Sequence, residues 1–258
     1  MAIEILTAFG LQVLCTIGVI VLFGWLISLC NRQFYVNMGK YGRAACYVTA
    51  FIGTPVHELS HALMCVIFGH KITDIKLFNI GSDGTLGYVS HSYNKRNIFQ
   101  CAGNFFIGVA PITVISALMY GLACLLIPQF TEKAAVLATG SFEDMPGRIE
   151  YMWQVIIAFF SAATTWQWWV FVLAGMFLAL HMNLSGADIK SAAKGLVIVL
   201  ALLLAADIII GLVSLAALES FTAWMSGAGS VMFCFLLLAL TISLLAVAFS
   251  FIFKLLRK

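Results

Sequence analysis

The sequence His57-Glu58-Leu59-Ser60-His61 combines two imidazoles and a carboxylate at a spacing that suits metal chemistry. On an α-helix, residues i and i+4 lie on the same face, so His57 and His61 could bind one zinc ion. Glu58 lies about 100° further round the helix and could reach a water molecule at the ion. The pattern therefore predicts a catalytic zinc site with Glu58 as the general base.

A third zinc ligand must come from another segment, because catalytic zinc sites usually have three protein ligands and a water. The candidates are His91, His181, Asp188 and Asp207. Asp188 follows Ser185–Gly186, which can break a helix, and its carboxylate would neutralise one zinc charge in a low-dielectric site. We expect Asp207, within the apolar run LLAADIIIG, to be a buried, protonated and hydrogen-bonded carboxyl group. From the residues alone, the choice among these ligands stays open.

The elements that must position these residues are strongly apolar. Of 258 residues, 62% are hydrophobic and 10% are charged, whereas soluble domains have roughly 45–50% and 25%. A bilayer is crossed by about 20 apolar residues. We expect an all-α polytopic membrane protein, one integral membrane domain over residues 1–258 with about six transmembrane helices: Ile3–Leu29, Ala44–Gly69, Ile98–Ile127, Trp166–Leu184, Leu196–Leu218 and Ser230–Phe253.

Two segments between these spans have a different character. Residues 70–97 contain two runs of alternating polarity around the turn sequence GSDG, which predicts a small β-hairpin. Its amides cannot face lipid unpaired, so this hairpin must be membrane-associated, at the interface or packed on helices. Residues Pro128–Thr165 are acidic at first, and their second part could be an interfacial helix or belong to a long fourth span.

The distribution of positive charge predicts the orientation. If the N-terminus is cytoplasmic, nine of the 14 Lys and Arg residues fall on that side, and five on the other: Arg32, Lys40, Arg43, Lys133 and Arg148. This bias predicts that both termini are cytoplasmic. No basic stripe with interleaved aromatic residues occurs, which argues against nucleic-acid binding. The seven cysteines contain no C-x-x-C pair, so we interpret them as small core residues and not as thiolate metal ligands.

Three stretches of the sequence resemble the site-2 protease family of intramembrane zinc metalloproteases. HELSH within a span is similar to the family's first motif, and a hairpin-like segment follows it. AGNFFIGVAP (Ala102–Pro111) stands where the family often has A-G-P-x-x-N. HMNLSGADIK, which begins at His181, is a weaker counterpart of N-x-x-P-x-x-x-L-D-G, with Asn183 and Asp188 as the matching residues. The similarity covers residues 44–194, a catalytic core of spans two to four, and is closest to the minimal six-span bacterial branch without a PDZ domain.

This resemblance implies a zinc metalloendopeptidase of the bacterial plasma membrane, which cleaves a membrane-protein substrate within or next to its transmembrane segment. It selects Asp188 as the third zinc ligand, with His181 as the runner-up. It suggests Asn104 and Asn183 as substrate or oxyanion contacts, while His91 could lie near the site. The hairpin could capture an unwound substrate as an added strand or merely cover the site.

Three other functions are compatible with parts of the sequence. A transporter or channel could use the buried polar residues to bind a cation. It would need charged or polar residues along several spans, and Ser230–Phe253 has no charged residue. A catalytically silent zinc receptor could bind peptides, although such a protein has little need of Glu58. A zinc hydrolase could act on a lipid or lipoprotein instead of a peptide.

Overall fold

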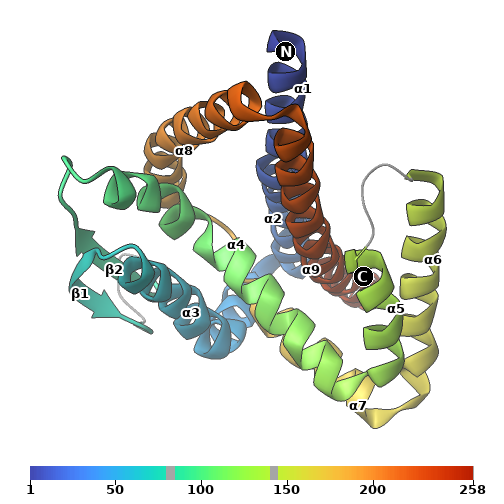
Figure 1. Cartoon of the computed structure of the whole chain (residues 1–258). Coiled ribbons are helices and arrows are strands. Elements are labelled where there is room, and N and C mark those ends of the chain that lie inside the picture. Colours follow the sequence, from blue (N-terminus) through green and yellow to red (C-terminus); the bar gives the residue numbers. More distant parts are fainter. Residues whose placement is uncertain (80–84, 140–144, 258) are drawn as a thin grey trace.

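The computed structural model describes residues 1–79, 85–139 and 145–257. Helices make up most of this part of the chain (Figure 1). They are α1 (Ala2–Val13), α2 (Val19–Met38), α3 (Gly42–Ile67), α4 (Ile98–Leu126), α5 (Pro128–Thr139), α6 (Met145–Ser161), α7 (Trp166–Ala179), α8 (Gly186–Val213) and α9 (Leu215–Leu256). A π-helical turn, η1 (Leu14–Gly18), joins α1 to α2, and the short 3-10 helices η2 (Gly39–Tyr41) and η3 (Ala162–Thr164) precede α3 and α7.

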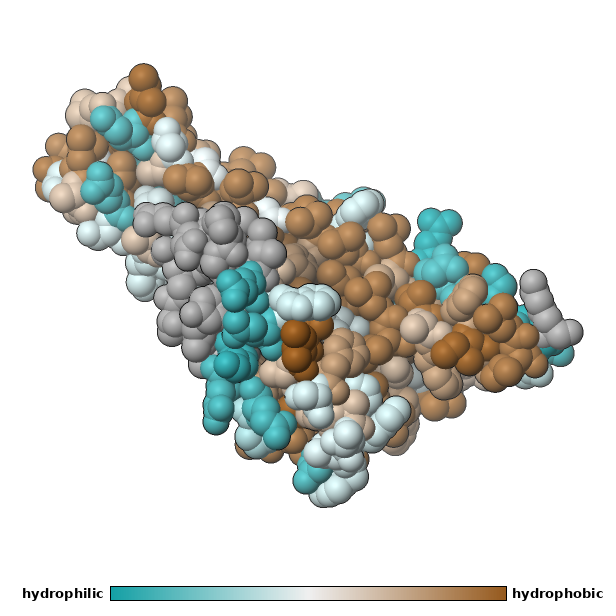
Figure 2. Space-filling view, turned by 90° about the vertical axis from the view of Figure 1, so that its right-hand side faces the viewer, coloured by the Kyte–Doolittle hydropathy of each residue, from teal (hydrophilic) through white to brown (hydrophobic). Residues whose placement is uncertain are grey.

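The apolar helices agree with an integral membrane protein, but six separate spans are not confirmed. Within the described residues, four helical segments are long and apolar enough to cross a membrane, and the first of them, Ala2–Ile67, includes two of the predicted spans. The fifth candidate is a pair of helical segments, Met152–Thr164 and Trp166–Ala179, bent by 114°. Apolar side chains cover much of the face in Figure 2, and exposed large ones on the bent pair include Trp153, Trp166 and Trp169.

The fourth predicted span, Trp166–Leu184, begins at the same residue as α7 but is longer than that helix. A straight helix of 14 residues, the length of α7, is only about 21 Å long, less than the roughly 30 Å hydrocarbon core. Thr165 is extended, and its side chain accepts a hydrogen bond from the Trp168 amide, so it ends one helix and caps the next. The segment before Trp166 is therefore a separate helix that meets α7 at an angle.

Helix α9 runs alongside α1 and α2 in the same direction (Figure 1). Ile5 packs with Leu218 at one end, the Phe23 and Phe233 rings are 5.2 Å apart further along, and Arg257 Nη1 donates to the Met38 carbonyl, 3.0 Å away, at the other end. The two chain termini consequently lie at opposite ends of this bundle. This arrangement does not support the prediction that both termini are cytoplasmic.

The expected β-hairpin is present as a two-stranded antiparallel sheet of β1 (Lys71–Lys76) and β2 (Tyr88–Ser92). Its register pairs Ile72 with His91 and Lys76 with Tyr88, with an irregularity between Ile72 and Asp74. The predicted GSDG turn lies outside the described residues. Strand β1 begins directly after His70, which follows the end of α3, so the sheet is held close to the helix that carries the H-E-x-x-H sequence.

Candidate metal centre

Helix α3 carries His57, Glu58 and His61, and its neighbours approach it closely. A Cβ atom added to Gly53 would overlap the carbonyl oxygen of Phe177 near the end of α7. Helix α4 also contacts α3, where His61 Nδ1 lies 2.7 Å from the Ile107 carbonyl oxygen. The two histidines are thus held between the end of α7 and the middle of α4.

Both imidazoles have a defined tautomer. A carbonyl oxygen only accepts hydrogen bonds, so each Nδ1 that contacts one must carry a proton. His57 Nδ1–H donates to the His181 carbonyl, 2.7 Å away, and His61 Nδ1–H donates to the Ile107 carbonyl. Each neutral ring therefore presents its Nε2 lone pair on the other side. Metal-binding histidines usually have such a carbonyl or carboxylate partner at the second nitrogen.

The remaining atoms of the site converge on one point. The two Nε2 atoms are 3.2 Å apart, and Asp188 Oδ1 lies 3.3 Å from His61 Nε2. Two lone pairs and a carboxylate oxygen that face one another need a cation or an additional proton between them. His57, His61 and Asp188 form one of the side-chain groups in the described structure that could hold a metal ion. Two imidazole nitrogens and one carboxylate oxygen are a donor set that fits catalytic zinc.

The start of α8 positions Asp188. Ser185 is the N-cap residue, and its hydroxyl accepts a hydrogen bond from the Asp188 amide at 3.2 Å. Asp188 Oδ2 accepts from the Ser185 amide at 2.7 Å, which completes a capping box. One carboxylate oxygen thus stabilises the helix end while Oδ1 points to His61. The start of α8 packs closely against α4: a Cβ atom on Gly108 of α4 would lie only 2.5 Å from the Asp188 carbonyl oxygen.

A cavity of about 220 Å³ adjoins these groups. Its wall includes His57, Glu58, His61 and Asp188 on one side and Gly87, Tyr88, Val89 and His91 of the hairpin segment on the other. Glu58 is buried. A Cβ atom on Gly87 would lie 2.8 Å from Glu58 Cγ, so the absence of a side chain at this position lets the hairpin approach the carboxylate.

Comparison with known proteins gives no relative of this chain. No family model matches it, and neither does any curated protein or solved structure. Interpretation of the site therefore depends on its geometry.

The other residues singled out in the sequence have different surroundings. The His181 ring faces Thr49 and Thr54, with its nitrogens 3.0 and 3.4 Å from their hydroxyls, so only its backbone carbonyl serves the candidate centre. Asp207 is buried and accepts a hydrogen bond from Gln12 Nε2 at 3.0 Å, so the expectation of a buried, hydrogen-bonded carboxyl group is confirmed. Asp207 is on α8, faces Gln12 of α1 and is not among the residues that line the cavity at the His57–His61 pair.

Asn104 and Asn183 take part in contacts between helices. Asn104 is buried, and its Oδ1 accepts a hydrogen bond from Ser191 Oγ at 3.3 Å, which links α4 to α8. Asn183 Oδ1 accepts from Asn31 Nδ2 at 3.2 Å, which links the α7–α8 connection to α2. These bonds link the helices around the candidate centre. They do not support a role for either amide as an oxyanion donor.

His91 does line the cavity, from strand β2. Burial lowers its pKa, and the nearby imidazoles of His70 and His61 lower it further. Sequence reasoning missed the two backbone carbonyls and Gly87. The carbonyls leave no mark on residue identity, whereas the glycine next to a predicted strand could have indicated a close approach of backbone.

Proposed function

We propose that this protein is an intramembrane zinc metalloprotease that hydrolyses a peptide bond within or next to a transmembrane segment of a substrate. The observation that carries the proposal is the convergence of the His57 and His61 Nε2 lone pairs with Asp188 Oδ1, beside the buried carboxylate of Glu58. His57, His61 and Asp188 would hold the zinc. The apolar helices around the site support a substrate within the membrane.

The chain's own groups then have distinct tasks. Zinc in such a site polarises a carbonyl and lowers the pKa of a water molecule. Glu58 would accept the proton of the attacking water and transfer it to the leaving amide nitrogen. The hydrogen bonds from His57 and His61 to the two backbone carbonyls keep both rings in the tautomer that leaves Nε2 free.

The walls of the cavity bear on the form of the substrate. The hairpin segment forms one of them beside Glu58, so a substrate bond that reaches Glu58 would also lie next to strand β2. Strand β2, whose Tyr88 and Val89 line the cavity, offers backbone groups that an extended segment could pair with as an added strand.

The experiment compares cells that express the wild-type protein with cells that express Glu58→Gln. New N-termini within or next to transmembrane segments would be identified by mass spectrometry of membrane fractions. We expect fragments in the wild type that fall by about 10²–10⁴-fold in the variant, the usual contribution of a general base. Zinc content of the purified variant should stay at the wild-type level, because Glu58 is not a ligand.

The matched control is Glu132→Gln, which changes an exposed carboxylate on α5 and should leave the fragments unchanged. The same fragments at the same level in Glu58→Gln would reject Glu58 as the base. A change confined to modified lipids or lipoproteins, with no new peptide ends, would instead favour a zinc hydrolase of that other class.

A further inference from the structure

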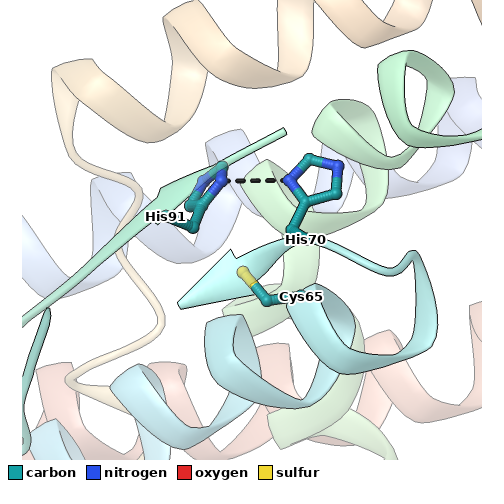
Figure 3. Close-up of side chains that lie close together, drawn as sticks. All are labelled: Cys65, His70 and His91. Atoms are coloured by element: carbon teal, nitrogen blue, oxygen red, sulfur yellow. Dashed lines mark hydrogen bonds between the residues drawn. The ribbon is translucent and has the colours of Figure 1, made fainter. Parts of the chain in front are cut away.

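A second group of side chains lies at the end of α3, and it is distinct from the first. Cys65 is on the last turn of α3, His70 follows the helix, and His91 comes from β2 (Figure 3). Their ligand atoms, the cysteine Sγ and one nitrogen from each ring, all lie within 4.8 Å of one another. Cys65 and His70 are buried, and His91 is partly buried.

The tautomer of His70 can be deduced in the same way as for the first site. His70 Nε2 lies 2.7 Å from the Gln100 carbonyl oxygen and must donate to it. Its Nδ1 therefore carries a lone pair, and this lone pair faces His91 Nδ1 at 3.0 Å. The Gln100 side chain fixes the arrangement further, because its Nε2 donates to the Gly69 carbonyl and its Oε1 accepts from the Asn94 amide, both at 2.7 Å.

We propose that Cys65, His70 and His91 form a second metal site, which binds Zn²⁺. A thiolate and two imidazoles prefer a borderline or soft cation to Mg²⁺ or Ca²⁺, and zinc accepts such a mixture of sulfur and nitrogen ligands with water in the fourth position. Binding would release the Cys65 thiol proton to solvent. The metal–nitrogen bonds would replace the contact between the two rings. The carbonyl of Gln100 provides the outer-shell partner that metal-bound histidines usually have.

The location gives this site a structural consequence. His57, His61 and Cys65 follow one another at intervals of four residues, so they share one face of α3, each about 6 Å further along the axis. An ion at Cys65 would fasten β2 to the same helix that carries His61. Since Gly87, Tyr88 and Val89 form a wall of the neighbouring cavity, the second ion would hold that wall in place.

Cobalt(II) can test this proposal separately from the first site. Co²⁺ bound to a thiolate has a charge-transfer absorption in the near ultraviolet, which a site with only nitrogen and oxygen ligands lacks. Purified full-length protein in detergent would be stripped of metal and titrated with Co²⁺. We expect the thiolate band in the wild type and in His57→Ala, and we expect its loss in Cys65→Ser and in His91→Ala.

The control is Cys46→Ser, which removes another thiol from α3 and should retain the band. Zinc analysis should give two ions per chain for the wild type and one for either His57→Ala or His91→Ala. His91→Ala changes a residue on the hairpin and provides a second variant should Cys65→Ser fail to fold, as judged by circular dichroism. Absence of the band in the wild type, or its persistence in a folded Cys65→Ser variant, would overturn the proposal without affecting the first site.

Discussion

Gly87→Ala should lower the turnover of the proposed protease without removing zinc from the His57–His61–Asp188 site. The added Cβ atom would lie 2.8 Å from Glu58 Cγ, 2.8 Å from Thr54 Cγ2 and 2.9 Å from the Lys76 carbonyl oxygen. Carbon atoms in optimal contact are about 3.5–4.0 Å apart, so the strand must retreat by roughly 0.7 Å or more. Because Thr54 is on a packed helix and the Lys76 carbonyl is backbone, rotation of the Glu58 side chain alone cannot relieve the overlap.

The expected effect follows from this displacement. A misplacement of about 1 Å at an active site can cost about 10²-fold in rate, so we expect turnover to fall by roughly tenfold to a hundredfold. The assay measures cleavage of a substrate identified by the Glu58→Gln comparison, with zinc content determined on the same preparations. Gly87 has no positive φ angle, so alanine there meets a steric obstacle and not a forbidden backbone conformation.

Gly121→Ala is the matched control, because a Cβ atom at this position of α4 meets nothing within 4 Å among the described residues. It should cleave the substrate at the wild-type rate. Wild-type turnover in Gly87→Ala would refute the reasoning that the hairpin wall lies against the proposed base, Glu58. Loss of zinc together with turnover would equally refute it, since the overlap would then act through the ligands and not through Glu58.

Three further predictions concern the rest of the molecule. Asp188→Ala should lose zinc and activity, whereas His181→Ala should keep most of the zinc because its backbone carbonyl remains; metal analysis of both variants would show the reverse if His181 were the ligand. Reporter tags at the N- and C-termini should be accessible from opposite sides of the membrane, and labelling of both from one side would contradict the parallel course of α1–α2 and α9. Asp207→Asn should preserve stability, because an amide oxygen can still accept from Gln12, while Gln12→Leu should cost about 1–3 kcal/mol in thermal unfolding by leaving a buried acceptor unpaired.

The local pattern of the sequence predicted much of the fold. Long apolar runs identified the helices that could cross a membrane, and alternation around a turn sequence identified the hairpin. The fourth span begins at the expected residue, Trp166, but hydropathy alone could not decide whether the preceding segment is a separate helix, because it does not report a bend. MWQVIIAFFSAATTWQWW is apolar on both sides of Thr165, and only the capping hydrogen bond from the Trp168 amide shows that two helices meet there.

Some features of the candidate site could be predicted from the sequence, and others could not. The four-residue spacing placed His57 and His61 on one face from sequence alone, and the Ser185–Gly186 break correctly suggested a way to turn Asp188 back. The partners of the two Nδ1 atoms could not be found, because they are backbone carbonyls from segments about 50 and more than 100 residues away in the chain. Cys65 is buried, in agreement with the interpretation of the cysteines as core residues. Its closeness to His70 and His91 could not be predicted, because these residues approach it only through the folding of the hairpin.

The capping box at the start of α8 connects helix formation to the proposed metal site. Asp188 uses Oδ2 to accept from the Ser185 amide and presents Oδ1 to His61, so the same interaction that begins the helix also fixes the angle of the proposed ligand. An aspartate one residue earlier or later would lose this geometry, because neighbouring positions point about 100° apart on a helix. The close contact of Gly108 with the Asp188 backbone then sets the distance between this end and α4. The angle and position of the carboxylate thus depend on two residues that are not themselves proposed ligands, Ser185 and Gly108.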